Sequence, residues 1–246
     1  MNDRREGLDT SFGYTRVAPA ERQRRIRAVF EAVAPRYDLM NDLMSFGIHR
    51  LWKRRLARGL PLAGRIVDLA GGTGDVARLL VAGGAAEVLV VDPSEAMMQA
   101  GRPQGGARLR WLAAEAEHLP LADGSVDALT VSFGLRNATR LEAALDEIRR
   151  VLAPGGRFAC LEFSRPAAWL RPFYDPYSFH VIPRLGRWVA REPAAYQYLV
   201  ESIRRFPDQA GFAGMLRGAG FDSVRWRNLS FGIACIHTAT RPGGPA

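Results

Sequence analysis

The spacing of hydrophobic positions predicts helices in the first quarter of the chain. Four apolar residues fall at i, i+3, i+4 and i+7, the spacing of one helix face: Ile26, Val29, Phe30 and Val33. Pro35 is expected to end that helix. A second apolar and basic stretch covers 37–60, with Gly47 as a break. We therefore predict a helical N-terminal cap over residues 1–60, in which 1–20 lie over the surface without regular structure.

After the cap, short apolar runs alternate with segments of helical pattern. The runs read as buried strands, and they are 65–70, 87–92, 108–113, 126–132 and 157–162. Helical patterns begin at Thr73, Ser94 and Arg140, and 154–156 reads as a turn. Alternation of this kind is typical of βαβ crossovers, which build a mainly parallel sheet covered on both faces.

The alternation is interrupted after the fifth strand. Residues 165–205 are rich in proline, aromatic residues and arginine, and we expect a helical lid insert there. A helix at 208–220 and two strands at 222–229 and 232–240 follow, and their short connection makes the strands antiparallel neighbours. The prediction is an α/β Rossmann-like fold in one domain, 1–246, with a seven-stranded, mostly parallel sheet whose last strand is antiparallel.

A glycine-rich loop follows the first predicted strand and opens a helix. Its sequence is DLAGGTGD, residues 68–75. Glycine permits the tight turn and lets a ligand approach the bare backbone. Gly72, Gly74 and Ala77 also fit the dinucleotide fingerprint, so this loop alone indicates only a nucleotide-like ligand.

Two acidic residues narrow the choice of ligand. Asp92 ends the next strand, where a carboxylate can accept both hydroxyls of a ribose; NAD enzymes and methyltransferases share this feature. Asp68 stands inside the first strand, and a buried carboxylate is costly without a partner. The α-ammonium of S-adenosylmethionine is a suitable partner; the alternative is that Asp68 caps amides of its own loop.

Further polar candidates follow the third and fourth strands. Glu115 and Ala116 come after the third strand, Ser132 ends the fourth, and Asn137 follows soon after. Ligands of open α/β sheets lie beyond the carboxyl ends of the strands, where these residues are expected to meet. Alone, Ser132 would be no more than a strand terminator.

These motifs resemble those of class I S-adenosylmethionine-dependent methyltransferases, and longer stretches resemble the C-methyltransferases of ubiquinone and menaquinone biosynthesis. The class is indicated by 68–74, by Asp92 and by the turn RVLAPGG at 150–156. The narrower family is indicated by RYDLMNDLMSFGIHRLWK at 36–53, TVSFGLRN at 130–137 and YSFHVIPR at 177–184. The resemblance covers nearly the whole chain.

The resemblance implies S-adenosylmethionine as cofactor and a polyprenylated quinol as substrate. It places cofactor contacts on Thr73, Asp92, Glu115, Ala116 and Ser132, beside Asp68, Gly72 and Gly74 of the loop segment. Family members usually carry Asn or Asp where this chain has Glu115. Glutamate can still accept a hydrogen from the adenine amino group, but it is one methylene longer.

Methylation of a ring carbon needs a general base and support for a developing phenolate. The family-like stretches supply Tyr37, Asp38, Asn41, His49, Arg136, Asn137, Tyr177 and His180, of which Tyr37, His49, Arg136 and Asn137 are our catalytic candidates. We expect Arg136 to stabilise the phenolate and Asn137 to position the ring; pairing of Arg136 with a carboxylate is the alternative. His49 and His180 are each either the base or a packed, hydrogen-bonded residue. No metal is predicted, since no Cys or His lies at zinc-ligand spacing.

Charge and composition bear on partners and location. The formal net charge is +9, of which residues 1–58 carry +6. The chain has no apolar run of 18 residues and no apolar N-terminal leader, so we expect a cytoplasmic protein. Aromatic residues and arginines in 165–205 suit a lipid headgroup zone, which favours peripheral contact with the inner face of the cytoplasmic membrane, although a plain cap with buried aromatics is the alternative. A homodimer or a biosynthetic complex is compatible with the sequence.

Two other classes of protein compete with the quinol methyltransferase. An NAD-dependent oxidoreductase is suggested by the glycines, but Lys53 is the only lysine, so a Tyr-x-x-x-Lys pair is impossible. A nucleic-acid-binding or RNA-modifying protein is suggested by the charge, but no RNA module is evident. We predict no nucleic-acid partner; the remaining alternative is a methyltransferase for another lipophilic molecule or for RNA.

Overall fold

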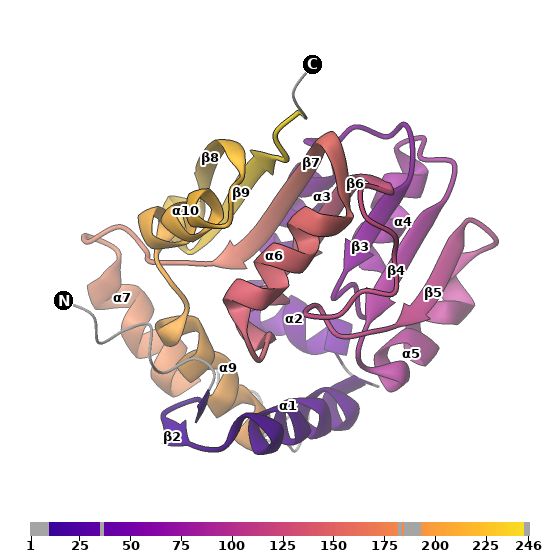
Figure 1. Ribbon diagram of the computed structural model, residues 1–246. Coiled ribbons are helices and arrows are strands. Elements are labelled where there is room, and N and C mark those ends of the chain that lie inside the picture. The colour runs from indigo at the N-terminus through magenta and orange to yellow at the C-terminus, as the bar shows by residue number, and fades with distance from the viewer. Residues whose placement is uncertain (1–9, 35–36, 182–183, 185–192, 244–246) are drawn as a thin grey trace.

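The computed structural model describes residues 10–34, 37–181, 184 and 193–243. A seven-stranded sheet with the order β5-β4-β3-β6-β7-β9-β8 forms its centre (Figure 1). The strands are β3 (Ile66–Leu69), β4 (Val88–Asp92), β5 (Leu109–Ala113), β6 (Val126–Ser132), β7 (Leu152–Phe163), β8 (Asp222–Leu229) and β9 (Ala234–Thr240). β9 pairs antiparallel with both β7 and β8, whereas the other pairs are parallel. The predicted fold and its antiparallel last strand are confirmed.

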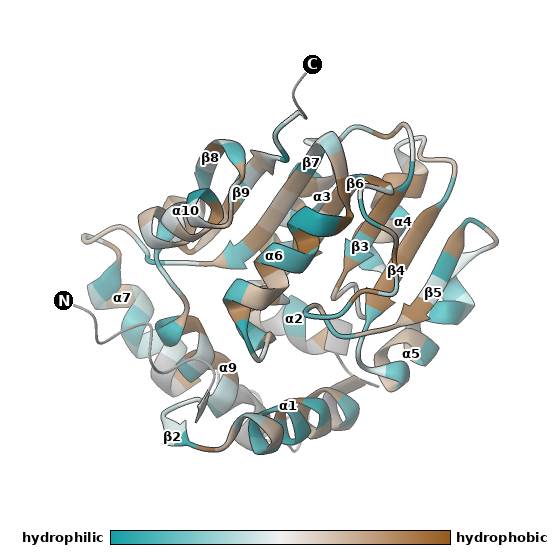
Figure 2. Ribbon diagram, viewed as in Figure 1, coloured by the Kyte–Doolittle hydropathy of each residue, from teal (hydrophilic) through white to brown (hydrophobic). Residues whose placement is uncertain are grey.

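Helices cover both faces of the sheet. They are α1 (Pro19–Val33), α2 (Tyr37–Ser45), α3 (Ile48–Ala57), α4 (Asp75–Ala82), α5 (Glu95–Gly105), α6 (Leu141–Val151), α7 (Arg171–Pro176), α9 (Pro193–Arg205) and α10 (Gln209–Gly218). Alternate side chains of β3 enter two separate cores. Val67 and Leu69 pack with α6 and α10, while Ile66 packs with α3 and α4. Figure 2 shows that the central strands β4 and β6 are largely brown, that is, hydrophobic.

Helices α1 and α2 and the insert lie together beyond the carboxyl ends of the strands, whereas α3 packs on one face of the sheet. Figure 1 places α1, α2 and α9 below the sheet, with α7 beside them. α1 contacts α9 and α5, so segments far apart in sequence form one roof over the strand ends. The break at Gly47 is confirmed, because Gly47 has φ +72° and separates α2 from α3. The insert is helical in α7, in the π-helical turn Tyr177–Val181 and in α9.

Two predicted segments need correction. Residues 11–16 were expected to lack regular structure, but β1 (Ser11–Phe12) and β2 (Thr15–Arg16) form a hairpin. Ser11 is buried, and its carbonyl accepts a hydrogen bond from Arg22 Nε at 2.9 Å, which fixes the hairpin on α1. β7 begins at Leu152 rather than at residue 157, because Leu152 pairs with Val126 across a register shift.

Within the described ranges, no helix combines the length and the apolar character needed to cross a bilayer.

Candidate active site

The glycine loop joins β3 to α4 in a left-handed turn. Gly74 has φ +79°, and a Cβ there would stand 2.8 Å from the Trp111 ring, so glycine is required on both counts. Ala70 and Phe133, which follow β3 and β6, also have positive φ values. Gly134 lets these two strand ends approach, since its Cβ would lie 2.4 Å from that of Ala70. Non-glycine residues with positive φ are strained and gather at functional sites.

Asp68 is 1% exposed and only partly satisfied. Its Oδ2 accepts a hydrogen bond from Ala77 N at 3.0 Å, so it caps the first turn of α4 rather than an amide of the glycine loop. Its Oδ1 is buried and has no hydrogen-bond partner among the described residues. Burial raises the pKa of Asp68 to about 7. A buried, half-satisfied carboxylate is suited to receive a cationic ligand group.

Asp92 is held rigidly at the end of β4. Its Oδ2 accepts from Gly72 N and its Oδ1 accepts from Ser94 N, both at 2.8 Å. Burial raises its pKa to about 6. Each carboxylate oxygen has two lone pairs, so Asp92 can accept ribose hydroxyls while it keeps both amide bonds.

A cavity of about 90 Å³ extends from Asp92 along the ends of β5 and β6. It is lined by several predicted cofactor residues: Gly72, Asp92, Glu115, Ala116 and Ser132. Glu115 Oε1 accepts from Gln23 Nε2 at 2.7 Å and pairs with Arg27 Nη2 at 3.2 Å, so α1 also borders this cavity. We call this space the donor cleft.

A smaller cavity of about 20 Å³ lies on the Asp68 side of the loop, and it is lined by Lys53, Asp68, Ala70, Gly71, Gly72, Thr73, Asp75, Val76 and Ser132. Ser132 lines both spaces, and its Oγ, like Asp68 Oδ1, is buried without a partner in the described part of the chain. These orphaned acceptors and the strained glycine turn fit the amino-acid and ribose ends of S-adenosylmethionine. Gly74 lines neither space; its part is to shape the turn.

A third cavity of about 300 Å³ is walled mainly by apolar and aromatic side chains. Its polar residues are Asn41, Ser45, His49, Arg136, Asn137, Tyr174, Tyr177, Tyr198 and Ser230. We call it the acceptor chamber. Phe30, Phe133 and Asn137 line both the chamber and the donor cleft, so the two spaces share a wall.

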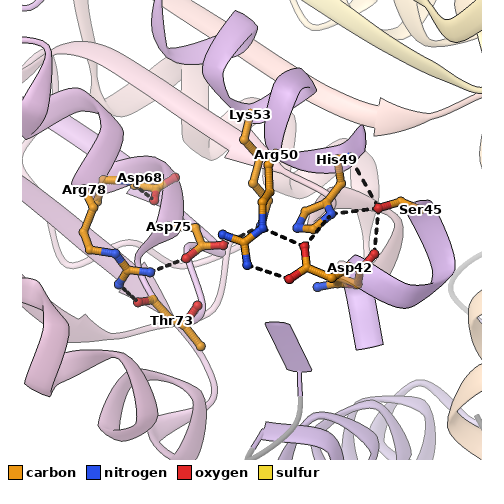
Figure 3. Close-up of polar contacts among 11 residues, drawn as sticks. Asp42, Ser45, His49, Arg50, Lys53, Asp68, Thr73, Asp75 and Arg78 are labelled. Carbon is orange, nitrogen blue, oxygen red and sulfur yellow. Dashed lines mark hydrogen bonds and ion pairs between the residues drawn. The ribbon is translucent and has the colours of Figure 1, made fainter. Parts of the chain in front are cut away.

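His49 is 4% exposed and oriented by Ser45 (Figure 3). Ser45 Oγ donates to Asn41 O at 2.7 Å and lies 2.8 Å from His49 Nδ1. Because the hydroxyl hydrogen is used on Asn41, His49 Nδ1 carries the proton and donates to Ser45 Oγ. His49 Nε2 then presents a lone pair, and it has no partner among the described residues. Burial and the charge of Lys53 lower the pKa of His49 to about 4, so the ring is neutral at physiological pH.

Arg136 and Asn137 lie in the 3₁₀ turn Leu135–Asn137 after β6. Arg136 Nη1 pairs with Glu162 Oε1 at 2.9 Å and also donates to Phe133 O. The carboxylate pairing weighed for Arg136 is therefore present, and Arg136 still lines the chamber. Asn137 Oδ1 accepts from Tyr198 OH at 3.0 Å. Tyr37 begins α2, but its side chain lies outside what the structure describes.

Sequence reasoning missed several residues of this region. Glu162 lies near the carboxyl end of β7, and the rule that placed Asp92 would have found it. Arg22 of α1 donates to the carbonyls of Arg136, Asn137 and Ala138 at 2.8–3.2 Å. No local sequence motif predicts this contact. The sequence marks Tyr198 only as one aromatic residue of the insert.

Solved structures place the fold among S-adenosylmethionine-dependent methyltransferases. A Thermotoga maritima methyltransferase matches with a TM-score of 0.65 and 22% identity, covering 88% of this chain and 99% of its own. The [4+2]-cyclase SpnF matches with a TM-score of 0.66 and 16% identity, covering 90% and 97%. Structural similarity at sequence identities this low establishes the fold only. Because one of the two similar structures is a cyclase, the fold alone does not determine the reaction. The fold is that of the class I S-adenosylmethionine-dependent methyltransferases.

A family model narrows the class. The chain belongs to the ubiE/COQ5 methyltransferase family, whose model matches residues 18–241. A relative from Rubrivivax gelatinosus, named ubiquinone/menaquinone biosynthesis C-methyltransferase UbiE, is 66% identical over 236 residues, which is 95% of this chain and 94% of that protein. A Paracoccus denitrificans protein of the same name is 50% identical over 242 residues, 95% and 97% of the two chains. The family resemblance stated from the sequence is confirmed.

Proposed function

We propose that this enzyme transfers a methyl group from S-adenosylmethionine to a ring carbon of a polyprenylated benzoquinol, of demethylmenaquinol, or of both. The observation that carries the proposal is the shared wall between a polar donor cleft and an aromatic acceptor chamber. Methyl transfer is an in-line displacement, so the protein must hold donor and acceptor at contact distance on one line. Membership of the ubiE/COQ5 family and the names of the relatives support the quinol substrates.

The donor is held by the loop and the strand ends. Asp68 accepts the α-ammonium, Asp92 accepts the ribose hydroxyls, and Glu115 with Ala116 borders the adenine, while Gly72, Thr73 and Ser132 line the space between. When bound, S-adenosylmethionine supplies an electrophilic methyl group. The protein directs that methyl toward Phe133 and Asn137, which face both spaces.

His49 is the proposed general base. Its Nε2 lone pair can take the proton of the ring hydroxyl, directly or through one water, and electron density then moves to the ortho carbon. The new carbon–carbon bond would form as the donor's carbon–sulfur bond breaks, with S-adenosylhomocysteine as the leaving group. The ring hydrogen would then leave to solvent as a proton, which restores aromaticity, and His49 would return its proton to the ring oxygen. Ser45 fixes the required tautomer and is a positioning residue.

Arg136 and Asn137 support the developing phenolate and the ring. The Arg136 guanidinium has a further donor, Nε, which is buried without a partner within the described ranges. The ion pair with Glu162 holds the Arg136 guanidinium beside the chamber. Asn137, held by Tyr198, is placed to orient the ring at the shared wall.

The prenyl tail needs an apolar exit, and the chamber mouth provides one. Phe46 and Ile48 line the chamber and yet are 78% and 39% exposed. Trp169 and Phe231 pack edge to face at 5.0 Å and are also exposed, and Phe231 follows Ser230 of the chamber. We infer that this rim, in a chain of net charge +9, docks on an anionic bilayer.

The function is tested by quinone analysis of cells that lack this chain. Accumulation of the unmethylated quinol precursor, reversed by the wild-type gene, is the expected result, and the mass of the precursor identifies the benzoquinol or the naphthoquinol ring. Unchanged quinones would contradict the proposal.

Docking is tested by flotation with vesicles containing anionic lipid, in which Phe46→Ser/Phe231→Ser should float several-fold less than wild type; no flotation of wild type at low salt would refute it.

A further inference from the structure

Lys53 is the only lysine in a chain with 33 arginines. It lies on α3 and is 7% exposed, which is unusual for a lysine unless its charge is paired. Nζ lies 3.1 Å from Asp75 Oδ2, at the first residue of α4 and directly after the glycine loop. A helix of the cap therefore brings a positive charge to the loop (Figure 3).

The surroundings of Lys53 form a compact network around the small cavity. Arg78 donates to Asp75 and, at 2.7 Å, to Thr73 O, so the loop is fixed from the side away from Lys53. Burial alone raises the pKa of Asp75, but the charge and the hydrogen bond of Lys53, together with smaller effects of Arg78 and His49, outweigh it, and the pKa lies below its usual value. Lys53 and Asp68 line the same cavity of about 20 Å³.

We propose that Lys53 binds the α-carboxylate of the donor's methionine end, while Asp68 binds the α-ammonium of the same group. This inference rests on the proposed function, which puts that end of the donor at Asp68. An amino acid carries both charged groups on one carbon, so its receptor needs an anion and a cation side by side. Asp68 and Lys53 are such a pair, and they come from different elements, β3 and α3.

The chemistry of lysine suits this task better than that of arginine. An ammonium has three donors, so Lys53 can hold Asp75 and a carboxylate oxygen at the same time. It is also a compact charge, whereas a planar guanidinium would fill the small cavity itself. His49 lies one helical turn before Lys53 on the same helix. Donor binding at Lys53 thus also fixes the helix that carries the proposed base.

The first test is calorimetry with two ligands that differ only in the carboxylate. S-adenosylhomocysteine carries the carboxylate, and its decarboxylated analogue keeps the amine but lacks it. Wild type should bind the analogue about 10- to 100-fold more weakly, the range for a charge-assisted hydrogen bond. Lys53→Met should bind both ligands within about threefold of each other. Arg54→Met, which removes an exposed positive charge from the same helix, is the matched control and should discriminate like wild type.

The outcomes separate this inference from the proposed function. If Asp68→Asn binds S-adenosylhomocysteine as tightly as wild type, the placement of the methionine end is wrong. If Asp68→Asn weakens binding but Lys53→Met still discriminates like Arg54→Met, only the role of Lys53 is wrong. Should Lys53→Met fold poorly because Asp75 loses its partner, Lys53→Met/Asp75→Asn removes both charges, and the same comparison of ligands applies.

A second measurement needs no variant. Because Lys53 is the only lysine, its acetylation can be followed by the mass of one peptide. S-adenosylhomocysteine should slow Lys53 acetylation at least about tenfold, since a bound carboxylate holds the ammonium charged. 5′-Methylthioadenosine, which lacks the whole amino-acid end, should leave the rate within about twofold. Equal protection by both ligands, or protection by neither, would overturn the assignment.

Discussion

The donor cleft and the acceptor chamber share a wall, but they are built in different ways. The cleft is formed mainly by strand ends and the loops that follow them, and its most rigid polar group, Asp92, is fixed by two backbone amides. The chamber is lined mainly by the cap and the insert, together with residues that follow the strands, and its polar groups are fixed by other side chains, as at His49 and Asn137. The space for the common methyl donor thus belongs mainly to the sheet, with the cap at its border, and the space for the particular acceptor belongs mainly to the roof.

The largest effect is expected from a substitution in the acceptor chamber that leaves ligand binding in the donor cleft unchanged. His49→Gln should lower kcat by about 10²- to 10⁴-fold, the usual contribution of a general base. Because His49 does not line the donor cleft, the Kd of S-adenosylhomocysteine should stay within about twofold. Initial rates with a soluble short-chain quinol and calorimetry measure the two effects. A kcat within threefold of wild type would leave His49 with a packing role only.

The next effect tests whether Arg136 acts on the acceptor or only fixes its loop. Arg136→Ala alone leaves Glu162 buried and unpaired, which should destabilise the fold by about 3–5 kcal/mol. Arg136→Met/Glu162→Gln removes both charges and should recover most of that loss in a denaturant titration.

If Arg136 supports the phenolate, the folded double variant should still lose about 10²-fold or more in kcat. Glu162→Gln alone, which keeps the cation, is the matched control and should lose much less. Equal kcat values in wild type and the double variant would show that the ion pair is structural.

A smaller effect of pH should appear in the cleft. Asp68 has a pKa of about 7 and must lose its proton to bind an ammonium, so S-adenosylhomocysteine should bind about tenfold more weakly at pH 6 than at pH 8. The free energy of unfolding without ligand should change in the opposite direction. The folded state holds the Asp68 proton more tightly than the unfolded state does, so Asp68 lowers the stability of the fold as pH rises from its ordinary pKa toward 7. Calorimetry between pH 6 and 8 measures the first effect. Asp68→Asn should flatten the profile, and an unchanged profile in that variant would assign the dependence elsewhere.

The smallest expected effect lies at the shared wall. Tyr198→Phe removes the hydroxyl that holds Asn137 and keeps the ring that stacks on Phe12 at 4.4 Å. We expect kcat to fall about three- to tenfold with an unchanged melting temperature, because only one neutral hydrogen bond is lost. Kinetics and thermal unfolding measure the two. A loss of stability with normal kcat would make Tyr198 a structural residue.

The same contrast explains what the sequence could reveal. The strand pattern, the glycine loop and Asp92 belong to consecutive βαβ units, so local spacing was enough to place them at one edge of the sheet. Arg22 and Arg136 are 114 positions apart, and their contact depends on how the cap docks. The two-stranded hairpin was missed for the same reason, because strands of two residues carry no hydrophobic period and are held by α1.

The pairing of Arg136 shows the limit of reasoning from residue types. A cation after the fourth strand predicted phenolate support, but its carboxylate partner comes from β7 and was not singled out as a site residue. Tyr37 stays a prediction, since its side chain lies outside the described residues.

The clamp made by Arg22 has a consequence for how the protein is handled in the laboratory. One buried guanidinium ties the carbonyl of Ser11 to the carbonyls of the 3₁₀ turn. Cleavage or a bulky fusion just before α1 would therefore disturb these hydrogen bonds of Arg22. The 3₁₀ turn at their other end lines the acceptor chamber, although it lies more than 100 residues later in the sequence. A preparation trimmed by proteolysis at that point should still bind nucleoside ligands while its turnover declines, so intact mass should be verified before any kinetic value is interpreted.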